Sequence, residues 1–215
     1  MKPADLLVRL RQRKLLAIIR GTDPARALAC IEVLAEEGID LIEVSLTSVD
    51  ALTVLAQAST RFGGVVELGA GTVMTADQAR AALDAGAGYL VTPSASAGAD
   101  EGVRMGAPVL MGALTPTEVA GALERGATAV KLFPAELGGP RYAAALRAPF
   151  PDVPFVPVGG IDPESARAFL DAGCVAVGVG SPLMGDAASG GDLQDLRTRA
   201  RDLRSSVTPE LVERT

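Results

Sequence analysis

The sequence places one lysine and one glutamate inside short apolar runs, where ionisable side chains are rare. Lys131 stands in Ala-Thr-Ala-Val-Lys-Leu-Phe-Pro, and Glu43 stands in Leu-Ile-Glu-Val-Ser-Leu. In an extended strand alternate residues share a face, so Lys131 faces the same way as Phe133, and Glu43 the same way as Ser45. We therefore expect both ionisable groups to point into one core, where they are candidates for chemistry.

Lys131 is a candidate nucleophile. A free lysine has a pKa of about 10.4, and burial or a neighbouring cation favours its neutral amine. Arg20, the only charged residue of its own apolar run, is the candidate cation. A neutral buried amine attacks a carbonyl to form an imine, which accepts electrons when an adjacent carbon–carbon bond is broken or made. Two structural roles for Lys131 remain as alternatives. It could form an internal ion pair with Glu43, or its aliphatic side chain could extend so that the amine reaches solvent.

Glu43 is the candidate acid–base group, because the chain contains no histidine. It is alternatively a structural counter-ion of Lys131. The lack of histidine also excludes histidine triads and histidine-bound zinc, although carboxylates remain available to Mg²⁺. We expect neither a metal nor a cofactor.

Further polar and glycine-rich positions follow the predicted strands. Arg20 either holds a carboxylate or caps a helix end. Thr72 and Thr92 end strands, although threonine is also common there for packing reasons. Val158-Gly159-Gly160 and Gly180-Ser181 resemble backbone cradles for phosphate, since glycine allows the main chain to approach a ligand closely.

Apolar, β-branched runs alternate with amphipathic segments along the whole chain. Strands are predicted at 15–20, 41–45, 65–70, 88–92, 108–111, 129–133, 155–158 and 176–179. Helices are predicted at 4–13, 24–37, 49–61, 75–85, 97–105, 116–125, 140–147, 163–172 and 192–204. This pattern predicts an α/β fold with one domain over residues 1–215, a single (β/α)8 TIM barrel with an extra N-terminal helix. An open doubly wound sheet is the alternative, but the first predicted strand lacks the expected G-x-G-x-x-G.

The composition of the chain limits the classes of molecule that it is expected to bind. The net charge of -6 and a pI of about 4.8 argue against binding to nucleic acid or an anionic membrane. No apolar run reaches the roughly 18 residues of a membrane span, and the amino terminus does not have the pattern of a signal peptide. We expect a cytoplasmic protein in which Cys30 and Cys174 are free thiols.

Seven motifs together resemble the class I keto-deoxy-phosphogluconate and keto-deoxy-phosphogalactonate aldolases, the KDPG/KHG aldolase family. In order, they are LLAIIRG, IEVSLTS, GAGTVMT, VTPSAS, VKLFPAE, VPVGGI and GVGS. The resemblance covers nearly the whole chain and implies a metal-independent barrel enzyme, typically a homotrimer. It also implies reversible cleavage of a 2-keto-3-deoxy-6-phospho-sugar acid to pyruvate and glyceraldehyde 3-phosphate.

The resemblance also implies a role for each site residue. Lys131 would form the Schiff base, and Glu43 would transfer protons with the help of a water. Arg20 and Thr72 would bind the keto-acid carboxylate, and Pro93 and Phe133 would shape the pocket. The phosphate would be held by Gly159, Gly160, Gly180 and Ser181.

Two segments favour the galactonate branch of the family. Glu43 is followed by Ser-Leu-Thr-Ser, whereas gluconate-type members tend to have Thr-Leu-Arg-Thr, and Val158 stands where they usually have threonine. The alternatives are a gluconate or broad 4-hydroxy-2-oxoglutarate aldolase of the same family. Outside it, the alternative is a phosphate-binding barrel without covalent chemistry, either an isomerase or synthase or a metabolite-binding protein.

Overall fold

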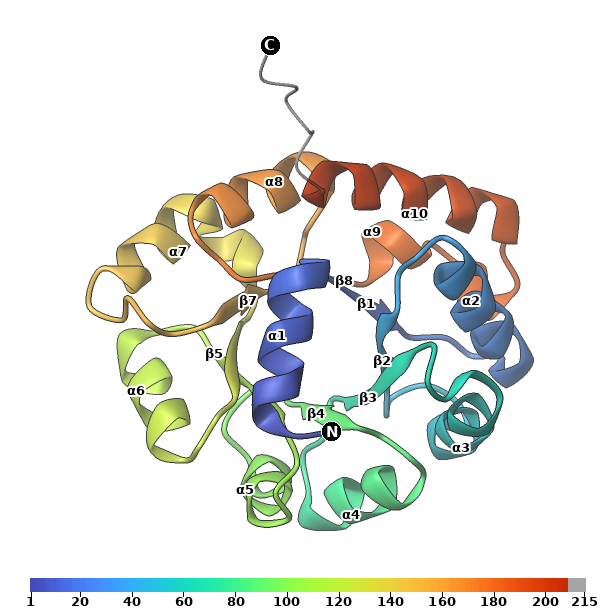
Figure 1. The fold of residues 1–215 in the computed structure, drawn as a ribbon, viewed down its shortest axis with the longest axis horizontal. Coiled ribbons are helices and arrows are strands. Elements are labelled where there is room, and N and C mark those ends of the chain that lie inside the picture. The colour runs from blue at the N-terminus through green and yellow to red at the C-terminus, as the bar shows by residue number, and fades with distance from the viewer. Residues whose placement is uncertain (209–215) are drawn as a thin grey trace.

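A computed structural model describes residues 1–208, and its centre is one sheet of eight parallel strands (Figure 1). The strands are β1 (Leu15–Ile19), β2 (Leu41–Ser45), β3 (Glu67–Gly71), β4 (Tyr89–Val91), β5 (Val109–Ala113), β6 (Ala129–Leu132), β7 (Phe155–Pro157) and β8 (Val177–Val179). Their order is β7-β6-β5-β4-β3-β2-β1-β8. A parallel bridge between Val158 and Gly178 joins β7 to β8, and the Val175 N–H donates to the Phe155 carbonyl at 3.0 Å. These contacts close the sheet into a TIM-barrel-like fold, so the barrel prediction is confirmed and the open sheet is wrong.

Helices surround this barrel. They are α1 (Pro3–Arg13), α2 (Pro24–Glu36), α3 (Ala51–Phe62), α4 (Ala76–Asp84), α5 (Ala97–Arg104), α6 (Pro116–Glu124), α7 (Gly139–Arg147), α8 (Pro163–Asp171), α9 (Ser181–Met184) and α10 (Leu193–Val207). Two 3₁₀ turns, η1 (Ala135–Leu137) and η2 (Ala187–Ser189), complete the described chain. Nine of the helices match the predicted segments to within two or three residues at each end, and the four-residue α9 was not predicted.

Side-chain caps fix where several helices begin. The Asp23 side chain accepts from the Ala25 and Arg26 N–H groups at the start of α2. Thr75 and Thr115 form capping boxes with residues three positions on, at the starts of α4 and α6. Each such cap satisfies backbone donors that have no partner within the helix. The caps thus fix the residue at which each of these helices begins after the preceding strand.

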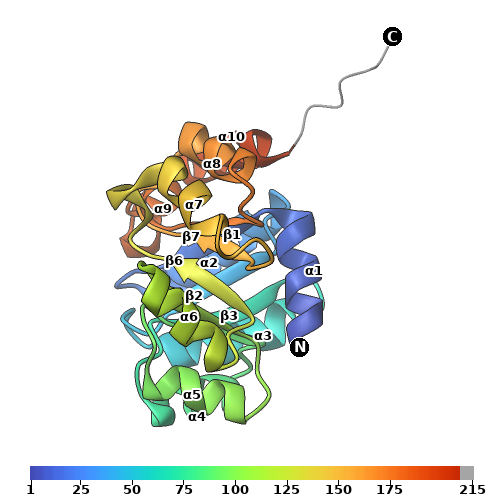
Figure 2. The same ribbon diagram turned by 90° about the vertical axis from the view of Figure 1, so that its left-hand side faces the viewer.

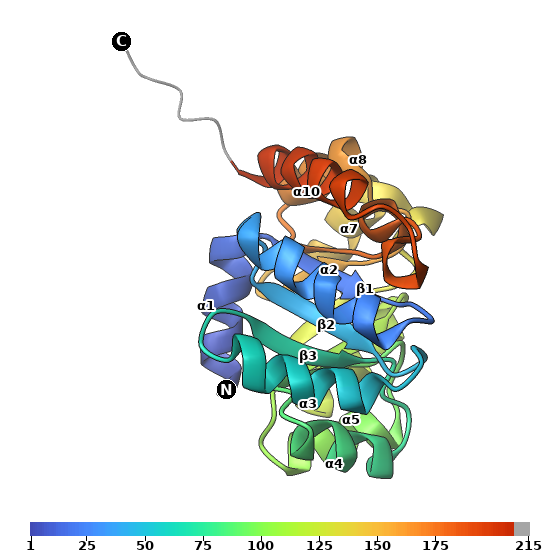
Figure 3. The ribbon, with the colours of Figure 1, turned by 90° about the vertical axis from the view of Figure 1, so that its right-hand side faces the viewer.

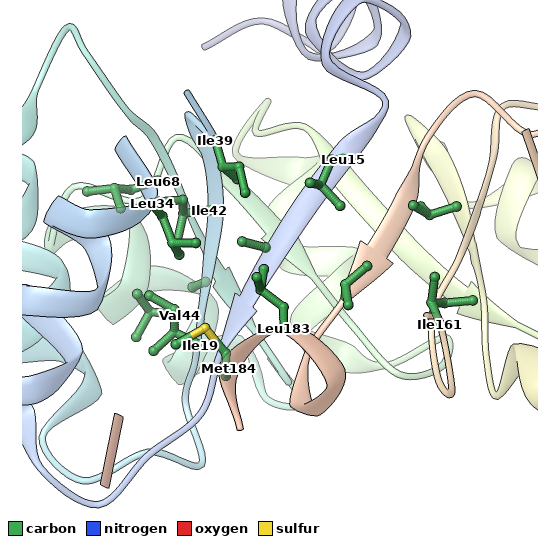
Figure 4. Close-up of a cluster of buried hydrophobic side chains, with 14 of the residues drawn as sticks. Leu15, Ile19, Leu34, Ile39, Ile42, Val44, Leu68, Ile161, Leu183 and Met184 are labelled. Atoms are coloured by element: carbon green, nitrogen blue, oxygen red, sulfur yellow. The ribbon is translucent and has the colours of Figure 1, made fainter. Parts of the chain in front are cut away.

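Two apolar regions stabilise the fold. The larger lies between the strands and the outer helices: Figure 4 shows Ile19, Ile42 and Val44 of the sheet packed near Leu34 of α2 and Leu183 of α9. These side chains occupy the outward positions of their strands. The alternate positions therefore point into the barrel.

The smaller apolar region fills the lower barrel, the end at which the strands begin. It contains inward-facing strand residues such as Leu16, Leu41 and Leu110, together with Leu6 and Leu10 of α1. All five side chains are nearly or completely inaccessible to solvent. Helix α1 crosses the end of the barrel at which the strands begin, as Figures 1, 2 and 3 show from three directions. The extra N-terminal helix thus closes one end of the barrel, leaving the carboxyl ends of the strands as the open mouth.

Cys30 and Cys174 are buried and free, and burial raises the pKa of their thiols to about 11 and about 12. Both thiols are therefore poor nucleophiles at neutral pH. Across residues 1–208, no helix is long and apolar enough to cross a membrane.

Candidate active site

A pocket of about 530 Å³ opens at the mouth of the barrel. Of the residues singled out from the sequence, Thr92 does not line it, and the following do: Arg20, Glu43, Thr72, Pro93, Lys131, Phe133, Val158, Gly159, Gly160, Gly180 and Ser181. Five further lining residues were not predicted: Ile18, Ile161, Pro182, Met184 and Gly185. Ile18 could have been predicted, because it alternates with the outward-facing residues of the first strand. Pro182, Met184 and Gly185 belong to α9 or its C-terminal end, and this helix is too short to show a periodic sequence pattern. The folding of the chain therefore gathers the predicted residues at one place.

Lys131 lies in the middle of β6 and reaches the pocket from the barrel wall. It is paired across the sheet with Gly112 of β5 and Val156 of β7, and its side chain is only 6% exposed. The amine lies 5.2 Å from the centre of the Phe133 ring, on the same face of the strand. A ring face stabilises a nearby cation only weakly compared with a carboxylate. The Lys131 amine thus lies at the pocket beside an aromatic ring.

A glycine opposite Lys131 allows a loop to bend inward over the pocket. A Cβ at Gly112 would overlap the backbone of Pro93 and Ser94, so only glycine leaves room for that loop. The Thr92 hydroxyl, which is fully buried, donates to the Ser94 carbonyl at 2.7 Å and braces the same turn. Pro93 consequently forms part of the pocket wall.

Glu43 lies on β2 with its carboxyl group inside the barrel, only 1% exposed. Its Oε2 is buried and has no hydrogen-bond partner among the described residues. Burial raises the pKa of Glu43, and the positive charges of Lys131 and Arg20 offset part of this effect. A carboxyl group with a raised pKa is suited to exchanging protons near neutral pH.

The two ionisable groups do not form the ion pair that the sequence left open. Within residues 1–208, no hydrogen bond joins Lys131 to Glu43, and no salt bridge in that range includes either residue. A purely structural counter-ion would be expected within about 4 Å. Neither group is therefore held in a direct ion pair with the other, and both line the pocket.

Thr72 follows β3 in an unusual backbone conformation. Its φ of 60° lies in the left-handed region, which β-branched residues rarely adopt. Its hydroxyl lies 3.1 Å from the Ser45 hydroxyl, which in turn lies 2.8 Å from the Thr47 hydroxyl. Strained backbone conformations cluster at active sites and ligand-binding positions.

Arg20 directly follows β1 at the edge of the pocket, and its side chain is exposed. No hydrogen bond or salt bridge within residues 1–208 holds its guanidinium, so the helix-capping role is not adopted. The next residue, Gly21, donates its N–H to the Ser48 hydroxyl at 3.2 Å, which ties this loop to the one after β2. The guanidinium is available to an anionic ligand.

The glycine-rich segments after β7 and β8 lie next to each other, because the Val158–Gly178 bridge joins their strands. Gly159 and Gly160 have φ values of 106° and 68°, which favour glycine. Gly180 precedes α9, which begins at Ser181. Among residues 1–208, no three side chains of the kinds that bind metals gather into a cluster.

A sequence profile described as KDPG and KHG aldolase matches residues 7–198, most of the chain. The chain belongs to this family. Its members are aldolases, so the protein is a lyase whose barrel mouth holds the family's motifs. This agrees with the family expectation drawn from the seven motifs.

Individual members of the KDPG and KHG aldolase family support the assignment. The chain is 37% identical to the 2-dehydro-3-deoxy-6-phosphogalactonate aldolase of Escherichia coli strain K12, over 79% of this chain and 83% of that protein. A solved structure described as native KDPGal has a TM-score of 0.84 and 33% identity, over 89% of this chain and 93% of that one. A KDPG aldolase from Legionella pneumophila, with pyruvate captured at low pH as a covalent carbinolamine intermediate, has a TM-score of 0.81. It is 25% identical and covers 96% of this chain and 97% of its own.

Proposed function

We propose that this aldolase cleaves 2-dehydro-3-deoxy-6-phosphogalactonate to pyruvate and D-glyceraldehyde 3-phosphate through an imine on Lys131. The observation that carries the proposal is a buried lysine at the pocket, without a carboxylate partner among residues 1–208 and beside a buried glutamate. The covalent carbinolamine of the Legionella pneumophila relative supports an amine nucleophile. In this pocket Lys131 is the lysine that lines the wall.

The chemistry begins with carbon–nitrogen bond formation. The neutral Lys131 amine adds to C2 of the keto acid, C2 oxygen takes up a proton, and loss of water leaves a protonated imine. Glu43, acting with a solvent water, removes the proton of the C4 hydroxyl. The C3–C4 bond then breaks, its electron pair moves into the imine to give an enamine, and the aldehyde leaves.

The second half returns the enzyme to its starting state. Glu43 delivers a proton to C3 of the enamine, and water then adds to the imine carbon. The C–N bond breaks, releasing pyruvate and the Lys131 amine. The raised pKa of Glu43 suits a group that must both accept and donate a proton in one cycle.

Recognition would use the two ends of the pocket. Arg20 and Thr72 bind the carboxylate of the keto acid, with the guanidinium supplying charge and the hydroxyl supplying direction. Pro93 and Phe133 form the walls beside the imine.

The phosphate lies against the backbone of the two glycine-rich segments, at Gly159, Gly160, Gly180 and Ser181.

The galactonate epimer is supported by Val158 and by the segment after Glu43. Val158 is 6% exposed and lines the pocket, and it offers no hydroxyl to the C4 oxygen. The E. coli relative is named for the galactonate substrate. The alternative is gluconate or 4-hydroxy-2-oxoglutarate cleavage, since the family's description includes both activities.

We further propose that the protein is a cytoplasmic homotrimer, in line with the resemblance of its motifs to this family. Size-exclusion chromatography with light scattering tests the assembly. A mass near three times 21.9 kDa supports the trimer, and a mass near 21.9 kDa contradicts it.

The first test is incubation with pyruvate and sodium borohydride, followed by peptide mass spectrometry. The expected result is a reduced pyruvyl adduct on Lys131, absent from Lys131→Met and retained in Lys2→Met. No adduct on folded wild-type protein would overturn the imine mechanism and favour a non-covalent phosphate-binding barrel. Initial rates with the two phosphorylated epimers then test the substrate, and a higher kcat/KM for the gluconate epimer would overturn the galactonate proposal.

A further inference from the structure

Three hydroxyl groups form a continuous chain that ends at the pocket. Ser45, the last residue of β2, is completely buried and lies between Thr47 and Thr72. Its Oγ is 2.8 Å from the Thr47 Oγ1 and 3.1 Å from the Thr72 Oγ1. Thr47 lies at the surface, whereas Thr72 lines the pocket. Ser45 is therefore the buried link between the surface and a proposed substrate-binding residue.

The backbone on both sides of Thr72 is fixed independently of this chain. The Gly71 carbonyl accepts from the Leu46 N–H at 2.8 Å, and the Val73 N–H donates to the Val91 carbonyl at 3.2 Å. Together with the φ of 60°, these bonds set the position of Thr72. What remains to be set is the direction of the Thr72 hydroxyl, and Ser45 is the side chain that contacts it.

The hydrogen-bonding capacity of Ser45 is matched to its neighbours. A serine hydroxyl has one proton to donate and can accept two hydrogen bonds. The Thr47 N–H donates to Ser45 Oγ at 3.4 Å, and the Thr47 hydroxyl can supply the second accepted bond. The single Ser45 proton is then directed to Thr72.

An anionic ligand selects this direction of the chain. A carboxylate only accepts hydrogen bonds, so Thr72 must donate to it. When Thr72 donates its one proton to the ligand, its bond with Ser45 must be one that it accepts, and Ser45 in turn accepts from Thr47. In the reverse direction Thr72 would present lone pairs to the carboxylate and repel it.

We propose that Ser45 is a positioning residue that presents Thr72 as a hydrogen-bond donor to the substrate carboxylate, with Thr47 at the outer end of the chain. Ser45 contacts no substrate itself. The inference rests on the proposed function, in which Thr72 binds the keto-acid carboxylate. It adds a specificity element to the segment Ser-Leu-Thr-Ser, because the Thr47 hydroxyl completes the chain.

The test compares wild-type protein with Ser45→Ala, Thr72→Val and the double variant. For each, the rate of borohydride trapping is measured against the concentration of pyruvate, and the KM for pyruvate is measured in the synthetic direction. Loss of one neutral hydrogen bond predicts a rise of about three- to tenfold in half-saturation by pyruvate for each single variant. The rate at saturating pyruvate should change by less than about twofold.

The double variant decides whether Ser45 acts through Thr72. If it does, the rise in the double variant equals that of Thr72→Val alone, because the residues share one interaction. Ser45→Thr keeps the hydroxyl and should restore wild-type half-saturation. Trapping of acetaldehyde, which has no carboxylate, should be unaffected by Ser45→Ala. Thr47→Val removes only the outer hydroxyl and should give a smaller rise than Ser45→Ala.

Several outcomes would overturn the proposal. Unchanged half-saturation in Ser45→Ala, effects of the two single variants that multiply, or equal losses for pyruvate and acetaldehyde would each exclude positioning through Thr72. Absence of any adduct on wild-type protein is a different result, since it removes the imine function itself. If Ser45→Ala does not fold, Thr47→Val alone and combined with Thr72→Val gives the same comparison.

Discussion

The carboxyl group of Glu43 occupies the space in which a side chain at Gly71 would lie. A Cβ at Gly71 would overlap the Oε1, Cδ and Cγ atoms of Glu43. Gly71 does not have a positive φ, so glycine is needed here for its lack of a side chain and not for its backbone conformation. Strand β3 thus leaves room for the proposed acid–base group of β2.

Gly71→Ala should displace Glu43 and reduce kcat by about 10²–10⁴-fold, the usual contribution of a general acid–base group. The measurement is steady-state kinetics, with circular dichroism to check the fold. Gly121→Ala, on α6 with open space around its backbone, is the control. Because Gly71 acts through Glu43, adding Glu43→Gln should cause little further loss. A Gly71→Ala enzyme with wild-type kcat would show that the carboxyl can move without cost.

Glu43→Gln should make the protein more stable than wild type above neutral pH and not below about pH 4. Burial raises the pKa of Glu43 in the folded state, so the folded protein resists losing that proton. As the pH rises from the unfolded pKa of 4.5 through the raised folded pKa, ionisation therefore destabilises wild type, whereas glutamine does not ionise. Thermal unfolding at about pH 4 and about pH 8 gives the two differences. Equal differences at both pH values would contradict the raised pKa.

Tyr89→Phe should raise the free energy of unfolding by about 1 kcal/mol. The ring of Tyr89 packs over Gly69 in the lower barrel, and its hydroxyl is buried without a partner among the described residues. Burial, with Glu43 nearby, raises the pKa of Tyr89, so its hydroxyl stays neutral. Urea unfolding measures the change, and a loss of stability would show that the hydroxyl has a partner in solution.

Gly160→Ala should raise the KM for D-glyceraldehyde 3-phosphate about tenfold and leave pyruvate trapping unchanged. Gly160 has a φ of 68°, and a Cβ there would press on the Glu136 side chain, shifting the proposed phosphate loop. Gly106→Ala introduces the same kind of backbone strain at a φ of 76° in open space outside the pocket. A rise for pyruvate as well would place Gly160 outside phosphate binding.

Val158→Thr should shift the ratio of kcat/KM values for the gluconate and galactonate epimers toward gluconate by about two- to tenfold. The added hydroxyl would lie at the pocket wall, and one hydrogen bond contributes about 0.5–1.5 kcal/mol. Val158→Ala, which shortens the side chain without adding a hydroxyl, separates shape from hydrogen bonding. An unchanged ratio in Val158→Thr would remove this residue from epimer selection.

Much of the fold was predictable because strands and helices differ in the spacing of their apolar residues along the sequence. Inward residues such as Lys131 and Glu43 interrupt apolar runs, and the runs themselves mark the strands. The predicted third strand began two residues early, at Val65, which is 65% exposed and lies before the register that starts at Glu67. The residue type of Val65 does not indicate whether its face of the chain is covered.

The site was predictable to the level of which residues meet, and less so in how they meet. Strand ends in a closed barrel must converge, so Arg20 and Gly180 were found from position alone. The separation of Lys131 from Glu43, and the contact of Ser45 with Thr72, depend on side-chain directions that no short-range pattern encodes. Helix α9 was missed because four residues are too few to show a helical period.

Helix α1 fills the end of the barrel at which the strands begin with Leu6 and Leu10, which leaves the opposite end as the open mouth. Substrates and products would therefore enter and leave through the open mouth, and in the proposed mechanism pyruvate stays bound to Lys131 until the final hydrolysis. The aldehyde therefore leaves first, and in synthesis the ketone donor must be loaded before its acceptor. An excess of phosphorylated aldehyde should then obstruct pyruvate entry, producing substrate inhibition by one reactant and not by the other.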